Sequence, residues 1–364
     1  MAYTVAVLGA TGLVGSHLIQ LLESRQFPVK RLKPLASQRS LGNSILFQGQ
    51  PIPVEEATPE AFEGVDLVLA SAGGSISARL VPEAIKRGAV VVDNTSEFRM
   101  HPQVPLVVAG VNNADLDWHQ GIVANPNCST AQLMPVLKAL HSAVGLKRVI
   151  ISTYQSVSGA GKEGLEELRE GLTVDMNNSL RHAHELETLS DQYHSPQVFQ
   201  RPIAFNLIPH IDVFSEADDD TYGYTREELK LIRETRKILD LPELPITATA
   251  VRVPVLVGHS ESVTVDLESP LSPEQAAQVL RNTPDVVVAS SLTDYHTPRE
   301  TAGTDPVYVS RIRRDTSNLQ TGLNLWVVAD NLRIGAALNA VRLAELLHER
   351  GKLAPVTASA LVTV

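Results

Sequence analysis

The sequence predicts an α/β protein with a Rossmann-like parallel sheet near its N-terminus and a second domain beyond it. Three observations predict this fold. The chain has 364 residues, more than one typical core, so two domains are the default. Valine-rich runs alternate with helical patterns through the first third, as in parallel sheets that helices cover on both faces. Around residues 250–267 apolar and polar residues alternate instead, which indicates antiparallel strands.

The composition is that of an ordinary globular protein, with 43% hydrophobic and 20% charged residues. A net charge of −10 without a long basic run argues against nucleic acid or an anionic membrane as partner. One cysteine cannot form an internal disulfide, so nothing requires an oxidising compartment. The N-terminal residues lack a basic region and become glycine-rich after eight residues, so we expect a first strand there rather than a signal peptide. No apolar stretch approaches the roughly 18 residues of a membrane helix. We therefore expect a cytoplasmic protein.

A glycine-rich turn follows the first predicted strand. Residues 4–8 are apolar, GATGLVG runs from Gly9 to Gly15, and apolar residues at helical spacing follow. Glycines permit a tight turn and close approach of the backbone, and the helix N-terminus behind them attracts a pyrophosphate. The spacing is G-x-x-G-x-x-G rather than G-x-G-x-x-G. The strand before it and the helix after it still favour dinucleotide binding at Gly9 and Gly12 over a purely structural turn.

Two further strands continue the pattern. Residues 65–71 lead through Ala72-Gly73-Gly74 to a helix that ends near Lys86, and residues 89–94 form the next buried strand. Ligands of such sheets bind where strands end and helices begin.

The second predicted strand lies near residues 29–36, and the residues at its end indicate whether the cofactor is NAD or NADP. An NAD site usually has Asp or Glu there to bond the ribose 2′-hydroxyl, whereas a 2′-phosphate requires a cation. Here the strand runs into SQRS, which contains no acid. We expect NADP, with Arg39 stacking on the adenine and pairing with the phosphate while Ser37 and Ser40 donate hydrogen bonds. A solvated Arg39 is the alternative.

The only cysteine follows another strand candidate, residues 121–125. Apolar residues at helical spacing come after ANPNCST, so Cys128 lies where a helix begins, capped by Ser129 or a neighbour, and Pro135 can kink this helix. The helix dipole and free amides stabilise a thiolate there. This position favours a nucleophile over the buried hydrophobe that a lone cysteine otherwise suggests. Beside a nicotinamide, a thiolate can add to a carbonyl, and hydride transfer then leaves a thioester that phosphate or water cleaves.

Two candidate partners of the thiol lie in the second half. The predicted strands break at Gly258-His259, and His259 is a candidate general acid/base because imidazole titrates near the working pH. A lone histidine is more often structural. Arg252 lies on a valine-rich strand, where a buried guanidinium requires an anion. A substrate carboxylate and an exposed strand face are the two interpretations of Arg252.

Three other segments give weaker signals. Glu227 and Lys230 lie one turn apart at a predicted helix start, which is typical of a solvated surface helix. Residues 156–163 are similar to a P-loop, but two of the required residues are replaced. Residues 182–185, HAHE, lack a third ligand at useful spacing, so we expect no metal site.

Taken in order, these segments resemble one family, the aspartate-semialdehyde dehydrogenases. The resemblance is carried by GATGLVG, SQRS, SAGGSIS, VVDNTSEFRM, ANPNCST, STYQSVSGAGKEG, FNLIPHID, RVPVLVGHSES and WVVADNLRIGAALNA. These motifs run nearly from end to end, and several are long and specific. The resemblance implies that the enzyme reduces β-aspartyl phosphate with NADPH to aspartate semialdehyde and phosphate, on the route to lysine, methionine and threonine.

The resemblance also implies roles for individual residues. Cys128 would be the nucleophile and His259 the acid/base, while Gln155 would orient the reacting groups or the acyl intermediate. The substrate would be held by Arg252 at its α-carboxylate, Glu227 at its amino group, and Arg99 and Lys230 at its phosphate, with Asn127 beside them. The cofactor contacts would also include Thr11, Leu13, Val14, Ala72, Gly73, Ser158, Gly159 and Asn331.

The same resemblance implies the domain organisation. Residues 1–127 would form the NADP-binding domain, completed by the C-terminal helix 331–364. Residues 128–330 would form an α+β catalytic and dimerisation domain with a mixed sheet. Ile334 stands where a lysine is common in the family. We expect a homodimer or a dimer of dimers.

Three alternatives stay open. N-acetyl-γ-glutamyl-phosphate reductase uses the same thiol chemistry on an acylated substrate, which has no ammonium for Glu227. A non-catalytic relative would bind a nucleotide or a protein partner. The presence of all four proposed site residues argues against it: Cys128, His259, Gln155 and Arg252. A cofactor-free cysteine hydrolase conflicts with the glycine turn and with SQRS.

Overall fold

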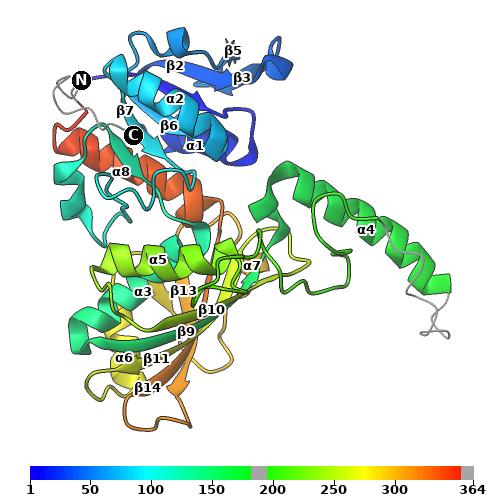
Figure 1. The fold of residues 1–364 in the computed structure, drawn as a ribbon, viewed down its shortest axis with the longest axis vertical. Coiled ribbons are helices and arrows are strands. Elements are labelled where there is room, and N and C mark those ends of the chain that lie inside the picture. Colours follow the sequence, from blue (N-terminus) through cyan, green and yellow to red (C-terminus); the bar gives the residue numbers. More distant parts are fainter. Residues whose placement is uncertain (182–194, 354–364) are drawn as a thin grey trace. The chain divides into compact units, whose positions relative to one another are not determined.

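The computed structural model of the protein describes residues 1–181 and 195–353 (Figure 1). Of residues 175–181 it describes the backbone alone. The chain forms two compact units. Unit 1 comprises residues 1–138, 233–243 and 332–364, and unit 2 comprises residues 139–232 and 244–331. Compared with the expected boundary after residue 127, unit 1 also holds 128–138 and 233–243.

Unit 1 is built on a parallel sheet, as the valine-rich runs predict. Its strand order is β5-β2-β1-β6-β7-β8, and every neighbouring pair is parallel. The strands are β1 (Tyr3–Leu8), β2 (Val29–Ala36), β5 (Glu55–Glu56), β6 (Leu67–Ala70), β7 (Val90–Asp93) and β8 (Ile122–Ala124). Residues 5–8, 67–70 and 90–93 are buried, because helices cover both faces of a sheet of this kind.

The helices of unit 1 follow from this strand order. Helix α1 (Leu13–Ser24) leads from β1 to β2, and α2 (Gly74–Lys86) leads from β6 to β7. The two crossovers run in opposite directions along the sheet, so the right-handed rule places α1 and α2 on opposite faces. Helix α8 (Leu338–Glu349) packs beside α1. The strand order reverses between β1 and β6, and sheets of this type bind ligands beyond the carboxyl ends of such strands.

The smaller elements of unit 1 connect these strands and helices. They are the hairpin β3 (Ser44–Phe47) and β4 (Gln50–Pro53), the 3-10 helices η1 (Gln38–Ser40), η2 (Pro59–Phe62) and η3 (Asn113–Trp118), and the π-helix η6 (Arg333–Ala337). Two helices cross the unit boundary along the chain: α3 (Cys128–Val144) and α5 (Arg226–Leu239).

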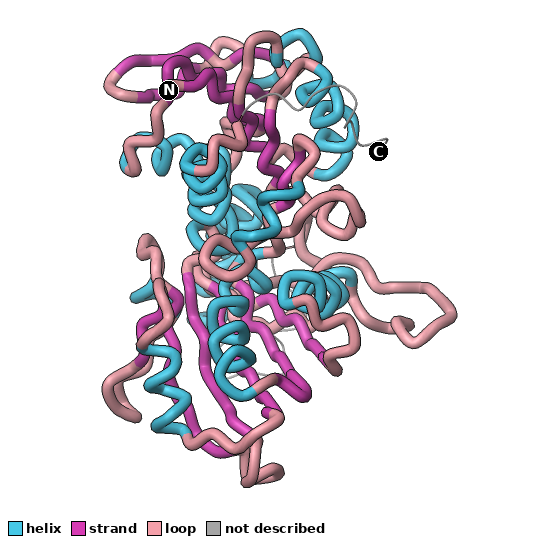
Figure 2. Tube along the Cα trace, turned by 90° about the vertical axis from the view of Figure 1, so that its left-hand side faces the viewer, coloured by secondary structure: helices cyan, strands magenta, loops and turns pink. Residues whose placement is uncertain are grey.

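Unit 2 is built on a mixed sheet, as expected, and Figure 2 draws its strands in magenta. The strand order is β10-β9-β11-β14-β13-β12. The pairs β10·β9 and β12·β13 are parallel and the others are antiparallel. The strands are β9 (Leu146–Gln155), β10 (Ile246–Arg252), β11 (His259–Leu267), β12 (Val286–Val288), β13 (Val307–Arg314) and β14 (Gly322–Ala329). The remaining elements are η4 (Val157–Ala160), α4 (Gly161–Arg181), α6 (Pro273–Arg281) and α7 (Pro298–Thr301).

The two faces of this sheet differ in burial. Along β9, β11 and β14, buried residues such as Ile151, Val263 and Leu325 alternate with half-exposed ones. On the half-exposed face the rings of Tyr154 and Trp326 lie 5.5 Å apart. Only one face of the sheet therefore contributes to the core of unit 2.

The alternating run after residue 250 forms less strand than its pattern indicates. Strand β10 ends at Arg252, and the chain turns before β11 begins at His259. Pro254 explains the early end, because proline cannot donate a ladder hydrogen bond. The two strands run in opposite directions but are not neighbours, since β9 lies between them.

Gly15 provides a test of the glycine turn. A Cβ at this position would lie 2.2 Å from the carbonyl oxygen of Gly9. We expect Gly15→Ala to lower the free energy of unfolding by about 2 kcal/mol or more, because the turn must open to relieve the clash. Thermal unfolding measures this loss. Gly74→Ala is the matched control, since a Cβ there would meet only the Glu97 side chain at 3.4 Å. Equal melting temperatures for wild type and Gly15→Ala would contradict the argument.

Candidate active site

The carboxyl edge of the parallel sheet collects the candidate groups of unit 1. The strands are in register there, so Leu8, Ala70, Asp93 and Ala124 lie side by side across β1, β6, β7 and β8. The chain continues from these four residues into the glycine turn, the Ala72-Gly73 turn, the segment with Arg99 and the cysteine turn. Parallel pairing therefore delivers four segments, far apart in sequence, to one edge.

The glycine turn fits a dinucleotide. Gly9 has a φ of +87°, a conformation that favours glycine, and a Cβ there would lie 2.7 Å from the carbonyl oxygen of Ser71. Gly12 is the N-cap of α1, and Leu13 and Val14 are the first residues of that helix. The unbonded amides of a helix N-terminus attract a pyrophosphate.

The turn after β6 also contains a glycine with a positive φ and leads into the N-terminus of a helix. Gly73, which follows Ala72, has a φ of +97° and is the N-cap of α2. Apart from Gly73 itself and its two chain neighbours, none of the described residues has a heavy atom within 4 Å of the position that a Cβ would take at Gly73. Two helix N-termini thus follow the neighbouring strands β1 and β6, where α/β sheets bind nucleotides.

The segment after β2 joins the glycine turn. Thr11 Oγ1 lies 3.3 Å from Ser40 Oγ. Arg39 is exposed in the short helix η1, and Ser37 is its N-cap. A cation and two hydroxyls therefore lie at the end of β2, which suits a 2′-phosphate. The sequence did not reveal that β5 places Glu56, an exposed carboxylate, beside Ala36.

Cys128 is the first residue of α3, as its spacing predicts, and its side chain is half-buried. The residue that caps this helix is Asn127, whose Oδ1 accepts the N–H groups of Ser129 at 3.0 Å and Thr130 at 3.4 Å. Gly335 of the π-helix η6 lies against the cysteine, since a Cβ there would be 2.8 Å from the Cβ of Cys128. Single π-turns of this kind are frequent at functional sites.

Arg99 is 7% exposed and is held by three acceptors. Its Nε donates to the carbonyl of Asn125 at 2.9 Å, and Nη2 donates to the carbonyl of Asn94 at 2.7 Å. Its Nη1 donates to Glu234 Oε1 at 3.0 Å. The other oxygen of Glu234 accepts the backbone N–H of Asn127 at 2.7 Å. The structure thus brings Arg99 and Asn127 together through Glu234, a residue that the sequence analysis missed.

In unit 2, three strand ends bring Gln155, Arg252 and His259 to one edge of the mixed sheet. Gln155 ends β9 and Arg252 ends β10, and the two residues pair in register. Strand β11 runs antiparallel to β9 and begins at His259, next to the pairing of Ser260 with Tyr154. The predicted acid/base, carboxylate ligand and orienting amide therefore lie on neighbouring strands of one sheet.

His259 is fully buried, and its Nδ1 accepts the backbone N–H of Ser156 at 3.1 Å. Nε2 is then the nitrogen that carries the proton of the neutral ring. Burial lowers the pKa of His259 to about 3; the Arg252 cation also lowers it, while Glu227 raises it. The sequence-based expectation that this ring titrates near the working pH is thus wrong for the structure described, because desolvation favours the neutral form.

Arg252 is 7% exposed, so the interpretation as an exposed strand face is wrong. Its Nη1 donates to the carbonyl of Ser156 at 2.7 Å, and its guanidinium carbon lies 5.8 Å from the centre of the Phe199 ring. A Cβ at Gly159 would come within 2.9 Å of Nη1. Glycine at this position therefore leaves room for the guanidinium.

Glu227 is buried rather than solvated, which corrects its interpretation as part of a surface pair. Its Oε1 accepts a hydrogen bond from Nε2 of Gln155 at 3.1 Å, and its Oε2 accepts one from Nζ of Lys230 at 3.3 Å. Lys230 is partly exposed and donates to Asp212 at 2.7 Å. A chain of hydrogen bonds thus runs from the Gln155 amide through Glu227 and Lys230 to Asp212, which the sequence alone did not reveal.

Asn331 joins the two turns of unit 2. Its Oδ1 accepts the hydroxyls of Ser156 at 3.1 Å and Ser158 at 3.2 Å and the N–H of Gly258 at 2.8 Å. Of the expected cofactor contacts, Ser158, Gly159 and Asn331 belong to unit 2, and the others belong to unit 1.

The sequence also draws attention to Ile334 and to the HAHE segment. Ile334 is 1% exposed within unit 1. The HAHE segment, residues 182–185, lies outside the described residues. The described residues contain no group of three or more His, Cys, Asp or Glu side chains that could hold a metal ion.

None of the helices within the described ranges is long and apolar enough to cross a membrane.

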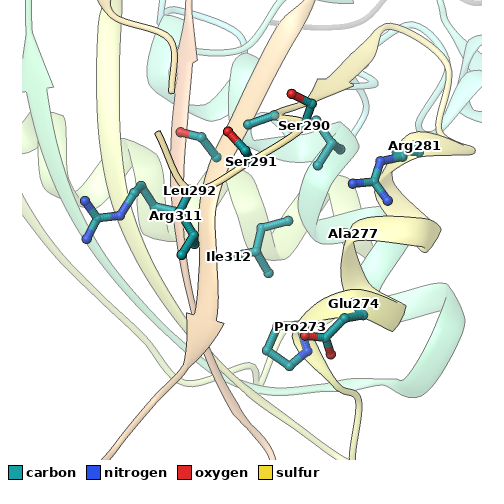
Figure 3. Close-up of a pocket in the computed structure, with 12 residues that line it drawn as sticks. Pro273, Glu274, Ala277, Arg281, Ser290, Ser291, Leu292, Arg311 and Ile312 are labelled. Atoms are coloured by element: carbon teal, nitrogen blue, oxygen red, sulfur yellow. The ribbon is translucent and has the colours of Figure 1, made fainter. Parts of the chain in front are cut away.

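A cavity of about 280 Å³ in unit 2 lies between α6, β13 and the loop after β12 (Figure 3). Pro273, Arg281, Ser290 and Arg311 are among the residues that line it. None of its lining residues is a predicted site residue.

A parallel-sheet nucleotide unit and a mixed-sheet unit define a two-domain oxidoreductase that uses a nicotinamide cofactor. Residues 4–119 match the family model described as "Semialdehyde dehydrogenase, NAD binding domain". Residues 137–334 match the model described as "Semialdehyde dehydrogenase, dimerisation domain". The chain belongs to the aspartate-semialdehyde dehydrogenase family, which confirms the resemblance seen in its motifs.

Individual relatives agree. The aspartate-semialdehyde dehydrogenase of Bacillus subtilis (strain 168) is 46% identical over 348 residues, which cover 95% of this chain and 97% of that protein. The crystal structure of aspartate semialdehyde dehydrogenase II from Vibrio cholerae, complexed with ASA, is 41% identical with a TM-score of 0.89, covering 96% of this chain and 99% of that one. The enzyme from Candida albicans, crystallised with NADP, is 25% identical with a TM-score of 0.73, covering 97% and 100%.

The buried His259 predicts a specific pH dependence of stability. Its pKa is about 3 in the folded protein against an ordinary value of 6.5, so below pH 6.5 the unfolded chain takes up a proton that the folded chain does not. The free energy of unfolding therefore falls as the pH drops from 6.5 toward 3. His259→Gln lacks this term, so the wild type should lose about 2 kcal/mol more than the variant between about pH 7.5 and pH 4.5. Urea unfolding at both pH values measures the difference, and parallel losses would refute it.

Proposed function

We propose that the protein catalyses the NADPH-dependent reductive dephosphorylation of L-aspartyl-4-phosphate to L-aspartate 4-semialdehyde and phosphate, on the route to lysine, methionine and threonine. The observation that carries this proposal is the family membership over nearly the full chain, with 46% identity across 95% of it in one relative. The position of the only cysteine at the first residue of α3 supports it independently.

The proposed chemistry begins at Cys128. Its thiolate, favoured at a helix N-terminus, would attack the acyl carbon and expel phosphate, which leaves a thioester. NADPH supplies the hydride when it is bound. The chain must hold the thioester during this transfer, which would leave a hemithioacetal oxyanion. The oxyanion would re-form the carbonyl of the aldehyde and expel the sulfur of Cys128, and one proton supplied by the chain would restore the thiol. The reverse sequence is a phosphate-dependent oxidation of the semialdehyde.

The groups of unit 2 would hold the amino-acid part of the substrate and the proton. Arg252 would clamp the α-carboxylate and Glu227 would meet the ammonium, while Gln155 would orient the acyl intermediate. The Arg252 cation lowers the pKa of His259. A carboxylate paired with Arg252 would offset this effect, so that substrate binding raises the pKa of His259 and enables the ring to exchange a proton.

Arg99 and Lys230 would hold the phosphate, with Asn127 beside it. Arg99 has five N–H groups, of which three donate to acceptors among the described residues, so two can face an anion. Lys230 is paired with Glu227 and Asp212, and a phosphate would compete for its ammonium.

NADP would bind along the carboxyl edge of the parallel sheet. The pyrophosphate would lie on Gly9, Thr11, Gly12, Leu13 and Val14 and on the turn at Ala72 and Gly73, with Ser37, Arg39 and Ser40 at the 2′-phosphate. Ser158, Gly159 and Asn331 would complete the contacts. The positive φ of Gly9 supports this proposal, because it allows the tight turn that leads the backbone from β1 into the N-terminus of α1.

We infer a functional division into a nucleotide domain, residues 1–127 with 331–364, and a catalytic and dimerisation domain, residues 128–330. The half-exposed sheet face with Tyr154 and Trp326 supports a homodimer through unit 2, and a dimer of dimers is the larger assembly proposed.

We place the reaction in the cytoplasm, without nucleic-acid or membrane partners. The acidic composition and the single cysteine support this location.

The main rival is an N-acetyl-γ-glutamyl-phosphate reductase. The buried Glu227 favours the aspartyl substrate, because an N-acetyl group would leave this carboxylate without a cation from the substrate. A comparison of kcat/KM for the two semialdehydes decides between these enzymes. A non-catalytic relative would show no phosphate-dependent NADP reduction at all.

Cys128→Ser tests the chemistry directly. We expect phosphate-dependent turnover to fall by about a thousandfold or more, because the hydroxyl is a far weaker nucleophile than the thiolate. NADPH binding, measured by fluorescence titration, should stay within about twofold of wild type, because the glycine turn is untouched. Turnover that survives in the variant would remove the proposed nucleophile.

Arg39→Asp tests the cofactor preference. The ratio of kcat/KM for NADPH to that for NADH should fall at least about tenfold, because a carboxylate repels the 2′-phosphate and can bond a 2′-hydroxyl. Arg31→Asp is the matched control, since it makes the same charge change on β2 at an exposed residue paired with Glu55. An unchanged ratio in Arg39→Asp, or an equal change in both variants, would contradict the assignment.

A further inference from the structure

One buried carboxylate connects the predicted phosphate ligand to the turn that carries the nucleophile. Glu234 lies in unit 1 on α5 and is 1% exposed. Its Oε1 accepts Nη1 of Arg99 at 3.0 Å, and its Oε2 accepts the backbone N–H of Asn127 at 2.7 Å. Asn127 precedes Cys128 and caps α3. The two oxygens of one side chain therefore fix the guanidinium relative to the start of the nucleophile helix.

We propose that Glu234 is a positioning residue for phosphate transfer: it holds Arg99 in register with the turn of Cys128. This inference rests on the function proposed above and goes beyond it, since it assigns a role to a residue outside the predicted substrate and cofactor contacts. Glu234 would not touch the substrate itself, because both of its oxygens are bonded to the chain.

The other bonds of Arg99 show what Glu234 adds. The carbonyls of Asn94 and Asn125 follow the neighbouring strands β7 and β8, and they fix two edges of the guanidinium plane. Neither carbonyl carries a net charge. Among the described residues, Glu234 is the carboxylate within ion-pair distance of Arg99. Asp93 also interacts with this cation: burial raises the pKa of Asp93, and the Arg99 charge acts in the opposite direction. A buried guanidinium that lost its ion pair would be strongly destabilising.

The same helix also holds the backbone of this segment. Lys237, one turn after Glu234, donates its ammonium to the carbonyls of Arg99 at 2.7 Å, His101 at 2.9 Å and Val104 at 2.9 Å. These three bonds use all three donors of a lysine. One face of α5 therefore holds both the side chain of Arg99, through Glu234, and the main chain of its segment, through Lys237.

The chemical consequence concerns the step at the thioester. Phosphate attacks, or leaves from, a carbon bonded to Cys128, so the groups that hold it must keep a fixed distance from that sulfur. A carboxylate can accept from Arg99 and Asn127 together. In a glutamine the NH2 group takes the place of one of the two carboxylate oxygens, so in the same geometry one of the two N–H groups would face a donor instead of an acceptor.

The test uses the full chain and the phosphate-dependent oxidation of aspartate semialdehyde. For Glu234→Gln we expect the KM for inorganic phosphate to rise about tenfold or more, as the loss of one charge-assisted bond predicts. The KM values for the semialdehyde and NADP should stay within about twofold. Glu234→Asp retains both acceptor oxygens on a shorter side chain and should give an intermediate KM for phosphate, which keeps the test decisive if the glutamine variant does not fold.

Glu228→Gln is the matched control. Glu228 is also a buried glutamate of α5, and it accepts the N–H groups of Thr225 at 2.7 Å and Ala250 at 2.9 Å. This variant should lower the melting temperature but leave the KM for phosphate unchanged. An unchanged KM for phosphate in both Glu234 variants, or an equal rise in Glu228→Gln, overturns the positioning role alone. Wild-type enzyme without phosphate-dependent turnover overturns the proposed function and this inference with it.

Discussion

Parallel pairing of neighbouring strands is the constraint on which the candidate site depends. In a parallel sheet the carboxyl ends of adjacent strands meet at one edge. In unit 1 this brings the turns after residues 8, 70, 93 and 124 together, although more than a hundred residues separate the first from the last. In unit 2 the parallel pair β9 and β10 places Gln155 beside Arg252 by the same rule. The chemistry is thus assembled by backbone hydrogen bonds before any side-chain contact is considered.

Buried charged side chains distinguish the sheet edge in each unit at which the candidate residues lie. A buried ion must be paired, because its desolvation otherwise costs several kcal/mol. Glu234 pairs with Arg99, and Glu227 contacts both Gln155 and Lys230. Each pair restrains the side chains that are proposed to meet the substrate. His259, in contrast, is buried as a neutral ring, because burial and the nearby Arg252 guanidinium lower its pKa.

Much of the fold could be predicted from the sequence, because its signals are local. The 2-residue and 3.6-residue periodicities and the glycine turns identified β1, α1 and the start of α3, and the family resemblance supplied the mixed sheet. The early end of β10 follows from Pro254, whose effect the valine alternation concealed. The site was predicted less completely. Glu234 and Ser156 act through partners distant in sequence, so no local pattern marks them, although Glu234 stands seven residues after Glu227, a spacing that shares one helix face.

The first residue of α3 has a practical consequence. Because Cys128 is the only cysteine in the chain, a thiol-directed fluorophore, spin label or fluorine tag would attach at one position without prior removal of other sulfhydryls. Spectra recorded from such a tag would report on the proposed reaction centre without background signals, so the wild-type sequence allows ligand binding to be followed from a single labelled position.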